Sequence, residues 1–190
     1  MTERIAIVGG TFDPIHNGHL VAATSARDQL GCDRTLVVVA SAPWQKTEIG
    51  ITPAAERFEM AQLAFAAVDG VEVSDLEMKR EGPTYTIDTV IELASPDREI
   101  YLVLGTDAVH GLESWSRASD LAQLVTIAAL SRNGEGRPVP HERWSIVSVV
   151  MPRLDISSTE IRSRVEQKRS ICGLTPPAVC EYIERRRLYQ

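Results

Sequence analysis

A short apolar run that leads directly into a turn rich in glycine and histidine is the feature that most restricts the fold of this chain. The apolar run covers residues 5–8, and a helix-like segment follows from Leu20. The stretch between them reads Gly9-Gly10-Thr11-Phe12-Asp13-Pro14-Ile15-His16-Asn17-Gly18-His19. Glycines at a strand end let the backbone turn sharply and approach a ligand closely, because they have no Cβ. The sequence therefore predicts a strand-turn-helix unit with a ligand site at the turn.

Within this stretch, His16 and His19 stand three residues apart at the opening of the expected helix. Free N–H groups and the positive end of the helix dipole favour anions there. The spacing is neither the dinucleotide fingerprint nor the Walker loop. Zinc would need further ligands, and no other cluster supplies them at the usual spacing. Simple capping of the helix suits one histidine better than two, so we interpret the pair as donors to phosphate.

Apolar runs alternate with helix-like segments along the rest of the chain. Strands are expected at residues 5–8, 36–40, 71–73, 100–104, 125–130 and 146–150. We expect Gly31 to end the first helix, and Thr52, Thr86, Asp120 and Ser157 to cap later ones. This alternation predicts an α/β fold, a Rossmann-like doubly wound parallel sheet flanked by helices, with its site at the carboxyl ends of the strands. We expect a single domain over residues 1–190, with a small helical portion at about 157–190.

Charge and composition restrict the partners. The formal net charge of −6 argues against a broad nucleic-acid surface, which requires a basic face. The sequence shows neither a long apolar span nor a leader peptide, so we expect no membrane partner and a cytoplasmic location. Three cysteines without C-x-x-C spacing predict neither a disulfide framework nor a metal knuckle. The cluster Arg185-Arg186-Arg187 is typical of a solvated helix end.

A second polar stretch follows the last expected strand. It reads Ile156-Ser157-Ser158-Thr159-Glu160-Ile161-Arg162. Ser157 and Glu160 stand in capping-box register, so a helix with free amides begins here. A plain helix cap is the simpler interpretation, but the hydroxyls of Ser158 and Thr159 and the charge of Arg162 favour a second anion cradle beside the first.

Several single residues elsewhere in the chain are further candidates for the ligand site. Lys46 suits a triphosphate oxygen or an ordinary surface position. Arg57, on the helix expected after Thr52-Pro53, could face the phosphates, but we expect it to be a solvated charge. Asp107 could accept from a ribose hydroxyl or cap a helix. Trp115 could pack in the core or stack on an aromatic ring, and residues 84–86 are by themselves an ordinary helix cap.

Residues 9–19 and 156–162, hereafter the first and second signatures, resemble those of the His-x-Gly-His nucleotidyltransferases, specifically the bacterial nicotinate mononucleotide adenylyltransferases. The resemblance covers nearly the whole chain. It includes Thr84-Tyr85-Thr86, Gly105-Thr106-Asp107-Ala108, Trp115 and a terminal Tyr-Ile…Leu-Tyr pattern. Two positions depart from the family pattern: Trp44-Gln45 precede Lys46 where a histidine is common, and Ser116 replaces an aromatic residue.

The resemblance implies adenylyl transfer from ATP to nicotinate mononucleotide. The sequence offers phosphate donors and no persuasive covalent nucleophile, so we expect direct in-line attack without a covalent enzyme intermediate. We also expect a Mg²⁺ ion held mainly through ATP phosphates, with no metal ligands from the protein. Catalysis would involve His16, His19, Lys46 and Arg162. ATP would contact Gly9, Gly10, Thr11, Phe12, His16, His19, Gly105, Asp107, Ile156, Ser158, Thr159 and Arg162. Nicotinate mononucleotide would contact Asp13, Lys46, Thr84, Tyr85, Thr86 and Trp115.

Other functions are compatible with some of the same motifs. The same chemistry could act on nicotinamide mononucleotide or phosphopantetheine, although the phosphopantetheine enzymes are shorter and lack the Tyr-Thr loop. A nucleotide-binding sensor without catalysis is a different class, which the intact histidines and Arg162 disfavour. An aminoacyl-tRNA synthetase core would require more chain for tRNA recognition. The sequence leaves open a homo-oligomer and the strictness for nicotinate over nicotinamide.

Overall fold

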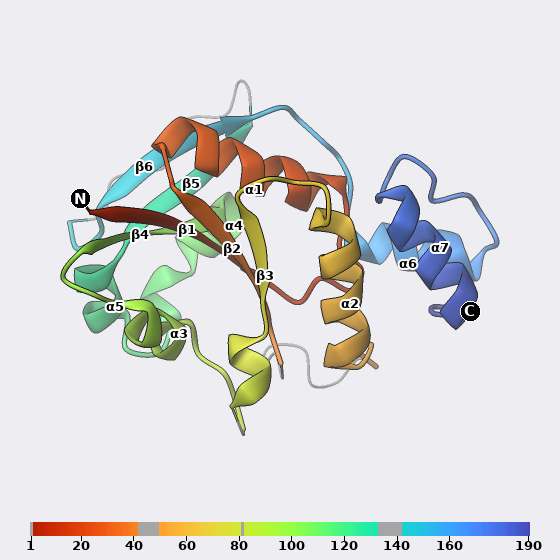
Figure 1. The fold of residues 1–190 in the computed structure, drawn as a ribbon, viewed down its shortest axis with the longest axis horizontal. Coiled ribbons are helices and arrows are strands. Elements are labelled where there is room, and N and C mark those ends of the chain that lie inside the picture. Colours follow the sequence, from red (N-terminus) through yellow and green to blue (C-terminus); the bar gives the residue numbers. More distant parts are fainter. Residues whose placement is uncertain (1, 42–49, 81, 133–141) are drawn as a thin grey trace.

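The computed structural model describes residues 2–41, 50–80, 82–132 and 142–190, and its centre is a six-stranded parallel sheet (Figure 1). The strands are β1 (Glu3–Gly10), β2 (Arg34–Val39), β3 (Val71–Ser74), β4 (Arg98–Gly105), β5 (Thr126–Arg132) and β6 (Ile146–Met151). Their order is β3-β2-β1-β4-β5-β6, and every neighbouring pair is parallel. This confirms the predicted doubly wound α/β fold. Its switch point lies between β1 and β4, where such sheets bind ligands.

Helices connect the strands and flank the sheet. They are α1 (Asn17–Leu30), α2 (Ala54–Phe65), α3 (Thr86–Leu93), α4 (Thr106–His110), α5 (Ala118–Leu124), α6 (Ser158–Glu166) and α7 (Pro177–Arg186). Among the described residues, 3₁₀ turns cover Leu76–Lys79 and Leu112–Ser114. Figure 1 shows α6 and α7 beyond α2, on the side of that helix away from the sheet. The part of the chain that the structure describes contains no helix long and apolar enough to cross a membrane.

The core has two layers because both faces of the sheet are covered. On β1, Ala6 and Val8 pack into a cluster with residues of α1, α2 and α7. The alternating residues Ile5 and Ile7 pack into a second cluster with residues of α3 and α5. A strand buried on both faces is apolar at consecutive positions, which explains the unbroken run at residues 5–8.

Some predicted helix ends are confirmed and others are wrong. Gly31 ends α1 with φ 61°, and the Oγ of Ser157 accepts a hydrogen bond from the Glu160 N–H at 3.1 Å. The residues that flank α2, α3 and α5 are instead Pro53, Tyr85 and Arg117, so Thr52, Thr86 and Asp120 are not caps. Asp120 instead forms an ion pair with Arg117 at 2.8 Å.

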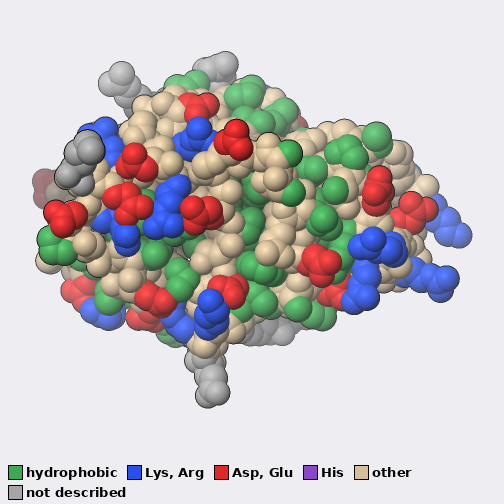
Figure 2. All heavy atoms as spheres, in the orientation of Figure 1, with side chains coloured by type: hydrophobic (Ala, Val, Ile, Leu, Met, Phe, Trp, Pro, Cys, Tyr) green, Lys and Arg blue, Asp and Glu red, His purple; other side chains and the backbone are tan. Residues whose placement is uncertain are grey.

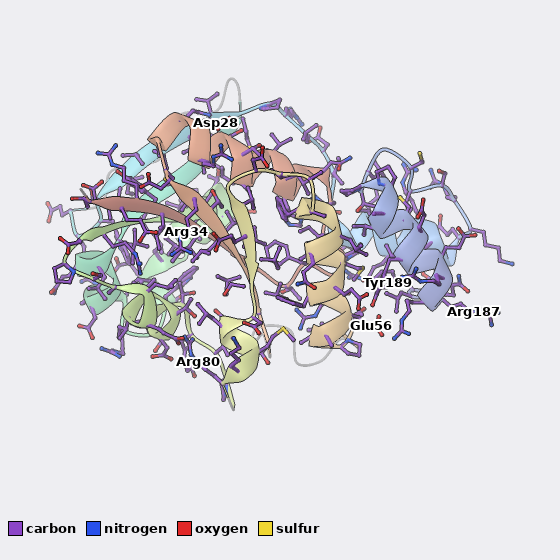
Figure 3. All side chains as sticks on the ribbon, viewed as in Figure 1. Asp28, Arg34, Glu56, Arg80, Arg187 and Tyr189 are labelled. Carbon is purple, nitrogen blue, oxygen red and sulfur yellow. The ribbon has the colours of Figure 1, made fainter. Side chains whose placement is uncertain are left out.

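The interface between α2 and α7 uses part of the C-terminal arginine cluster. Tyr182 donates a hydrogen bond to Glu56 at 2.6 Å, and Arg186 forms an ion pair with the same carboxylate. Figure 3 shows Glu56 and Tyr189 between these helices, and Figure 2 shows positive side chains gathered at the end of α7. The guanidinium of Arg185 lies 5.5 Å from the centroid of the Tyr182 ring. These arginines are therefore more than a solvated helix end.

Candidate active site

The turn after β1 is built differently from the sequence prediction. Gly9 and Gly10 remain part of β1, and the left-handed residue is Phe12, with φ 52°. A Cβ atom added to Gly10 would lie 2.8 Å from the ring of Phe12. Since Cβ contacts that short do not occur, Gly10 is needed to make room for this buried ring. Gly10 therefore allows close packing of the Phe12 ring, whereas we expected it to allow a sharp turn of the backbone.

His16 and His19 form a stacked pair at the start of α1. Their ring centroids are 3.7 Å apart with 23° between the planes, and the Phe12 ring meets His19 edge-on at 4.9 Å. The backbone N–H of His16 donates to Nδ1 of His19 at 3.1 Å. Because Nδ1 accepts this bond, the proton of neutral His19 lies on Nε2. A Cβ atom on Gly18 would lie 3.0 Å from the His16 ring, which explains the glycine between the histidines.

His16 is held in an unusual electrostatic state. His16 is only 8% exposed, and its Nδ1 has no hydrogen-bond partner among the residues that the structure describes. Burial lowers the pKa of His16 to about 4, so the imidazole is neutral at pH 7. A buried ring nitrogen without a partner is rare in folded proteins, and a catalytic role is one of the reasons for which such a group is retained.

This burial predicts a pH dependence of stability. Below pH 6.5 the unfolded chain protonates His16, whereas the folded chain does so only near pH 4, so folding stability is lost as the pH falls through this window. Between pH 7 and pH 5 the free energy of unfolding should fall by about 2 kcal/mol from His16 alone. Urea unfolding of the wild type and of His16→Asn, compared at both pH values, isolates this contribution. Equal losses in the two proteins would contradict it.

The two signatures meet in one cavity of about 390 Å³, which we name the histidine cavity. It is lined by Thr11, Phe12, Asp13, His16, His19, Ile51, Ile156, Ser157, Ser158, Thr159 and Arg162. Direct bonds join the signatures: Ser158 Oγ donates to the Pro14 carbonyl at 2.8 Å, and Arg162 Nη1 donates to the Asp13 carbonyl at 2.7 Å. The structure thus brings the two stretches together as expected, while their phosphate-binding roles stay predictions.

A second cavity of about 200 Å³ lies on the other side of Thr11, and we name it the tryptophan cavity. Its walls include Gly9, Gly10, Thr11, Thr84, Tyr85, Thr86, Trp115 and Ser116, with apolar side chains of β1, β2 and β4. Thr11 lines both cavities. Most residues that the resemblance assigned to ATP line the histidine cavity, but Gly9 and Gly10 line the tryptophan cavity instead, together with the acceptor candidates at 84–86 and 115.

The tryptophan cavity also contains Glu77, which the sequence reasoning missed. Arg80 Nη1 donates to Thr89 Oγ1 at 2.8 Å, and the Thr89 hydroxyl donates to Glu77 Oε1 at 3.1 Å. This chain ties the 3₁₀ turn that contains Glu77 to α3, and Figure 3 shows Arg80 at that turn. The segment has no apolar periodicity, so the sequence contains no signal that would single out Glu77.

Several other candidates lie away from their expected neighbours. Gly105 and Asp107 are exposed at the start of α4 and line neither cavity, and since Gly105 precedes the helix, Asp107 is not its cap. Asp13 was expected beside the acceptor but lines the histidine cavity, where its Oδ1 accepts a hydrogen bond from the Tyr189 hydroxyl at 2.7 Å. Lys46 lies outside the described residues.

Arg57 is not the solvated charge that we expected, because it is only 1% exposed. Its guanidinium donates to four backbone carbonyls, at 2.7 to 3.0 Å: those of Thr11, Ala40, Ser41 and Thr52. Burial lowers the pKa of Arg57, and the nearby charge of Asp13 opposes that effect. Arginine still stays charged at neutral pH because its ordinary pKa is so high. Arg57 therefore joins the chain leaving β1 to the chain leaving β2.

Comparisons with known proteins identify relatives over nearly the whole chain. A family model described as cytidylyltransferase-like matches residues 7–164. A probable nicotinate-nucleotide adenylyltransferase of Thermus thermophilus is 41% identical, over 98% of this chain and 100% of its own. One from Corynebacterium kroppenstedtii is 39% identical, over 98% and 90%.

Solved structures share the fold. A Plasmodium falciparum nicotinic acid mononucleotide adenylyltransferase complexed with NaAD matches with a TM-score of 0.79 and 22% identity, over 98% of this chain and 97% of that one. The same enzyme complexed with APC matches with a TM-score of 0.78. Curated relatives that share the name nicotinate-nucleotide adenylyltransferase are 36 to 41% identical to this chain over nearly its full length. The chain therefore belongs to the nicotinate-nucleotide adenylyltransferase family and is a nucleotidyltransferase.

Proposed function

We propose that this enzyme transfers the adenylyl group of ATP to nicotinate mononucleotide, giving nicotinate adenine dinucleotide and pyrophosphate. The observation that most strongly supports the proposal is the pair of adjoining cavities. One contains histidines, hydroxyls and an arginine suited to phosphates, and the other is mostly apolar and contains Tyr85 and Trp115. The relatives bear the name of this reaction, and a structural neighbour is complexed with NaAD.

The acceptor would occupy the tryptophan cavity. Trp115 lines this cavity and is suited to stacking on a pyridine ring, which contributes about 1 kcal/mol beyond area burial. Thr84, Tyr85 and Thr86 come from the start of α3, where backbone N–H groups favour a carboxylate. The 5′-phosphate would then point across Thr11 toward the histidine cavity, because Thr11 is common to both.

The transfer itself would be an in-line displacement. An oxygen of the acceptor 5′-phosphate forms a bond to the α-phosphorus of ATP, the bond to the bridging oxygen breaks, and pyrophosphate leaves with the electron pair. His19 presents an Nε2–H donor, and neutral His16 lies against it. Together with Arg162, and with Lys46 from the sequence, these groups would stabilise charge that develops on the phosphates.

The described side chains support direct transfer over a covalent intermediate. The Ser158 hydroxyl donates to the Pro14 carbonyl, and within the described part of the chain no base accepts its proton. The Cys32 thiol is buried, and burial raises its pKa to about 11, so it does not supply a thiolate at neutral pH. Donors aimed at phosphates, in contrast, suit catalysis by positioning and charge stabilisation.

Mg²⁺ is the expected cofactor. In residues 2–41, 50–80, 82–132 and 142–190, no group of three or more His, Cys, Asp or Glu side chains could hold a metal ion. The donors present fit an ion that arrives on the phosphates and keeps several waters. When bound in this way, Mg²⁺ neutralises charge on the phosphate oxygens.

Pyrophosphate release tests the proposal directly. Purified protein is incubated with ATP and Mg²⁺ and offered nicotinate mononucleotide, nicotinamide mononucleotide or phosphopantetheine in parallel. We expect fast release with the nicotinate substrate and much slower release with the other two. Preference for another acceptor would overturn the assignment of the tryptophan cavity and keep the chemistry. No release with any acceptor, from folded protein that still binds ATP, would overturn the enzymatic proposal in favour of a nucleotide sensor.

A further inference from the structure

The peptide unit between Ile15 and His16 is hydrogen-bonded at both of its ends. At one end, the hydroxyl of Thr175 donates to the Ile15 carbonyl at 2.8 Å. At the other end, the N–H of His16 donates to Nδ1 of His19 at 3.1 Å. Thr175 is only 1% exposed, and Ile15 is fully buried, so water does not compete for the bond between them.

This bond is one of a series in which the C-terminal segment holds the first signature. The carbonyls of Asp13, Pro14 and Ile15 accept hydrogen bonds from Arg162, Ser158 and Thr175, respectively. The segment just before Thr175 adds two more: the Asn17 N–H donates to the Leu174 carbonyl at 2.9 Å, and the Asn17 side chain donates to the Gly173 carbonyl at 2.8 Å. Thr175 is the member of the series whose bond acts on the peptide unit that contains the N–H of His16.

A trans peptide unit is planar, and its C=O and N–H point in opposite directions. Fixing the carbonyl of Ile15 therefore also fixes the direction of the His16 N–H. A hydrogen bond to the carbonyl in addition polarises the amide and strengthens its N–H as a donor. The hydroxyl of Thr175 thus influences the ring of His19 without touching it.

We infer that Thr175 is a positioning residue for the histidine pair: its hydroxyl orients the Ile15-His16 peptide unit so that Nδ1 of His19 stays an acceptor and the His19 proton stays on Nε2. That tautomer presents an N–H to the histidine cavity. The importance of the tautomer for turnover rests on the proposed function, whereas its dependence on Thr175 does not.

The kinetic test compares three variants. Thr175→Val removes the hydroxyl and keeps the branched shape, Thr175→Ser restores the hydroxyl, and Thr35→Val is the matched control. Thr35 is also fully buried, and its hydroxyl also donates to a backbone carbonyl, that of Ala23, away from both cavities. We expect Thr175→Val to lower kcat by about tenfold to a hundredfold with little change in KM for either substrate. Thr175→Ser and Thr35→Val should keep a kcat close to that of the wild type.

The spectroscopic test follows the His19 ring nitrogens by NMR in ¹⁵N-labelled protein at neutral pH, assigned with a His19→Gln sample. We expect an Nε2–H pattern in the wild type and in Thr175→Ser, and a mixed-tautomer pattern in Thr175→Val. A wild-type proton on Nδ1 would overturn the inference without any variant. An unchanged pattern in folded Thr175→Val, or a loss of kcat that serine does not restore, would also overturn it.

These two measurements separate the inference from the proposed function. A wild type that does not turn over nicotinate mononucleotide would remove the proposed function, while the NMR comparison would still decide the role of Thr175. If Thr175→Val does not fold, the wild-type and Thr175→Ser spectra still decide whether the tautomer is the one that the hydrogen bonds require.

Discussion

Replacing His16 with alanine is expected to lower kcat by about a thousandfold while changing KM for ATP by less than about threefold. His16 is buried, is neutral at pH 7 and lies in a cavity with His19, Ser158 and Arg162. A preorganised donor that acts mainly on charge developing in the transition state affects turnover more than ground-state binding. The measurement is the rate of pyrophosphate release at saturating and limiting ATP.

Two further variants make this result specific. His16 is also the residue that precedes α1, and asparagine is a favourable capping residue, so His16→Asn removes the imidazole without weakening the start of the helix. A loss of kcat shared by both His16 variants cannot be a capping effect. His110 is exposed at the end of α4 and lines neither cavity, so His110→Ala should match the wild type. Unchanged turnover with weaker ATP binding in His16→Ala would contradict the assigned role.

Arg57→Met is expected to lower the free energy of unfolding by about 3 to 5 kcal/mol. The change removes a buried charge whose hydrogen bonds hold three carbonyls just after β1 and β2 and a fourth, that of Thr52, just before α2. Methionine fills similar space but donates nothing, so these carbonyls lose their partner, and Asp13 loses the positive charge beside it. Urea unfolding monitored by circular dichroism measures the loss.

A matched arginine on the sheet provides the control. Arg34 forms ion pairs with Glu3 and Glu72, but its side chain is 30% exposed, so Arg34→Met should cost at most about 1 kcal/mol. Arg57→Lys should recover little of the stability, because lysine has no planar fork that reaches several carbonyls at once. Similar losses for Arg57→Met and Arg34→Met would show that the buried hydrogen bonds contribute no more than a surface ion pair.

The parts of the molecule that the sequence predicted well depend on local patterns. Apolar runs such as residues 5–8 and 100–104 gave the strands, because a strand buried on both faces must be apolar throughout. Ser157 was identified as a cap from its spacing to Glu160, since a capping box lies within one helical turn. The histidine pair and the second signature are likewise local motifs.

The predictions that were wrong concern side chains whose surroundings are set by tertiary contacts. Arg57 stands on an amphipathic helix like many solvated arginines, and its burial depends on carbonyls contributed by separate loops. Gly10 leaves room for the ring of Phe12, and propensity scales contain no information about such a contact. Asp13 turns out to accept from Tyr189, almost at the other end of the chain.

The sequence by itself therefore determined the α/β architecture, the position of the site at the carboxyl end of β1 and the two phosphate-binding candidates, because each follows from periodicity or spacing within a few residues. Only the tertiary structure decided how the histidines are held: the neutral buried His16, the tautomer of His19 and the bond from Thr175. The physical reason is that burial and hydrogen-bond partners depend on chain segments far apart in sequence, and no local pattern specifies which segments will meet.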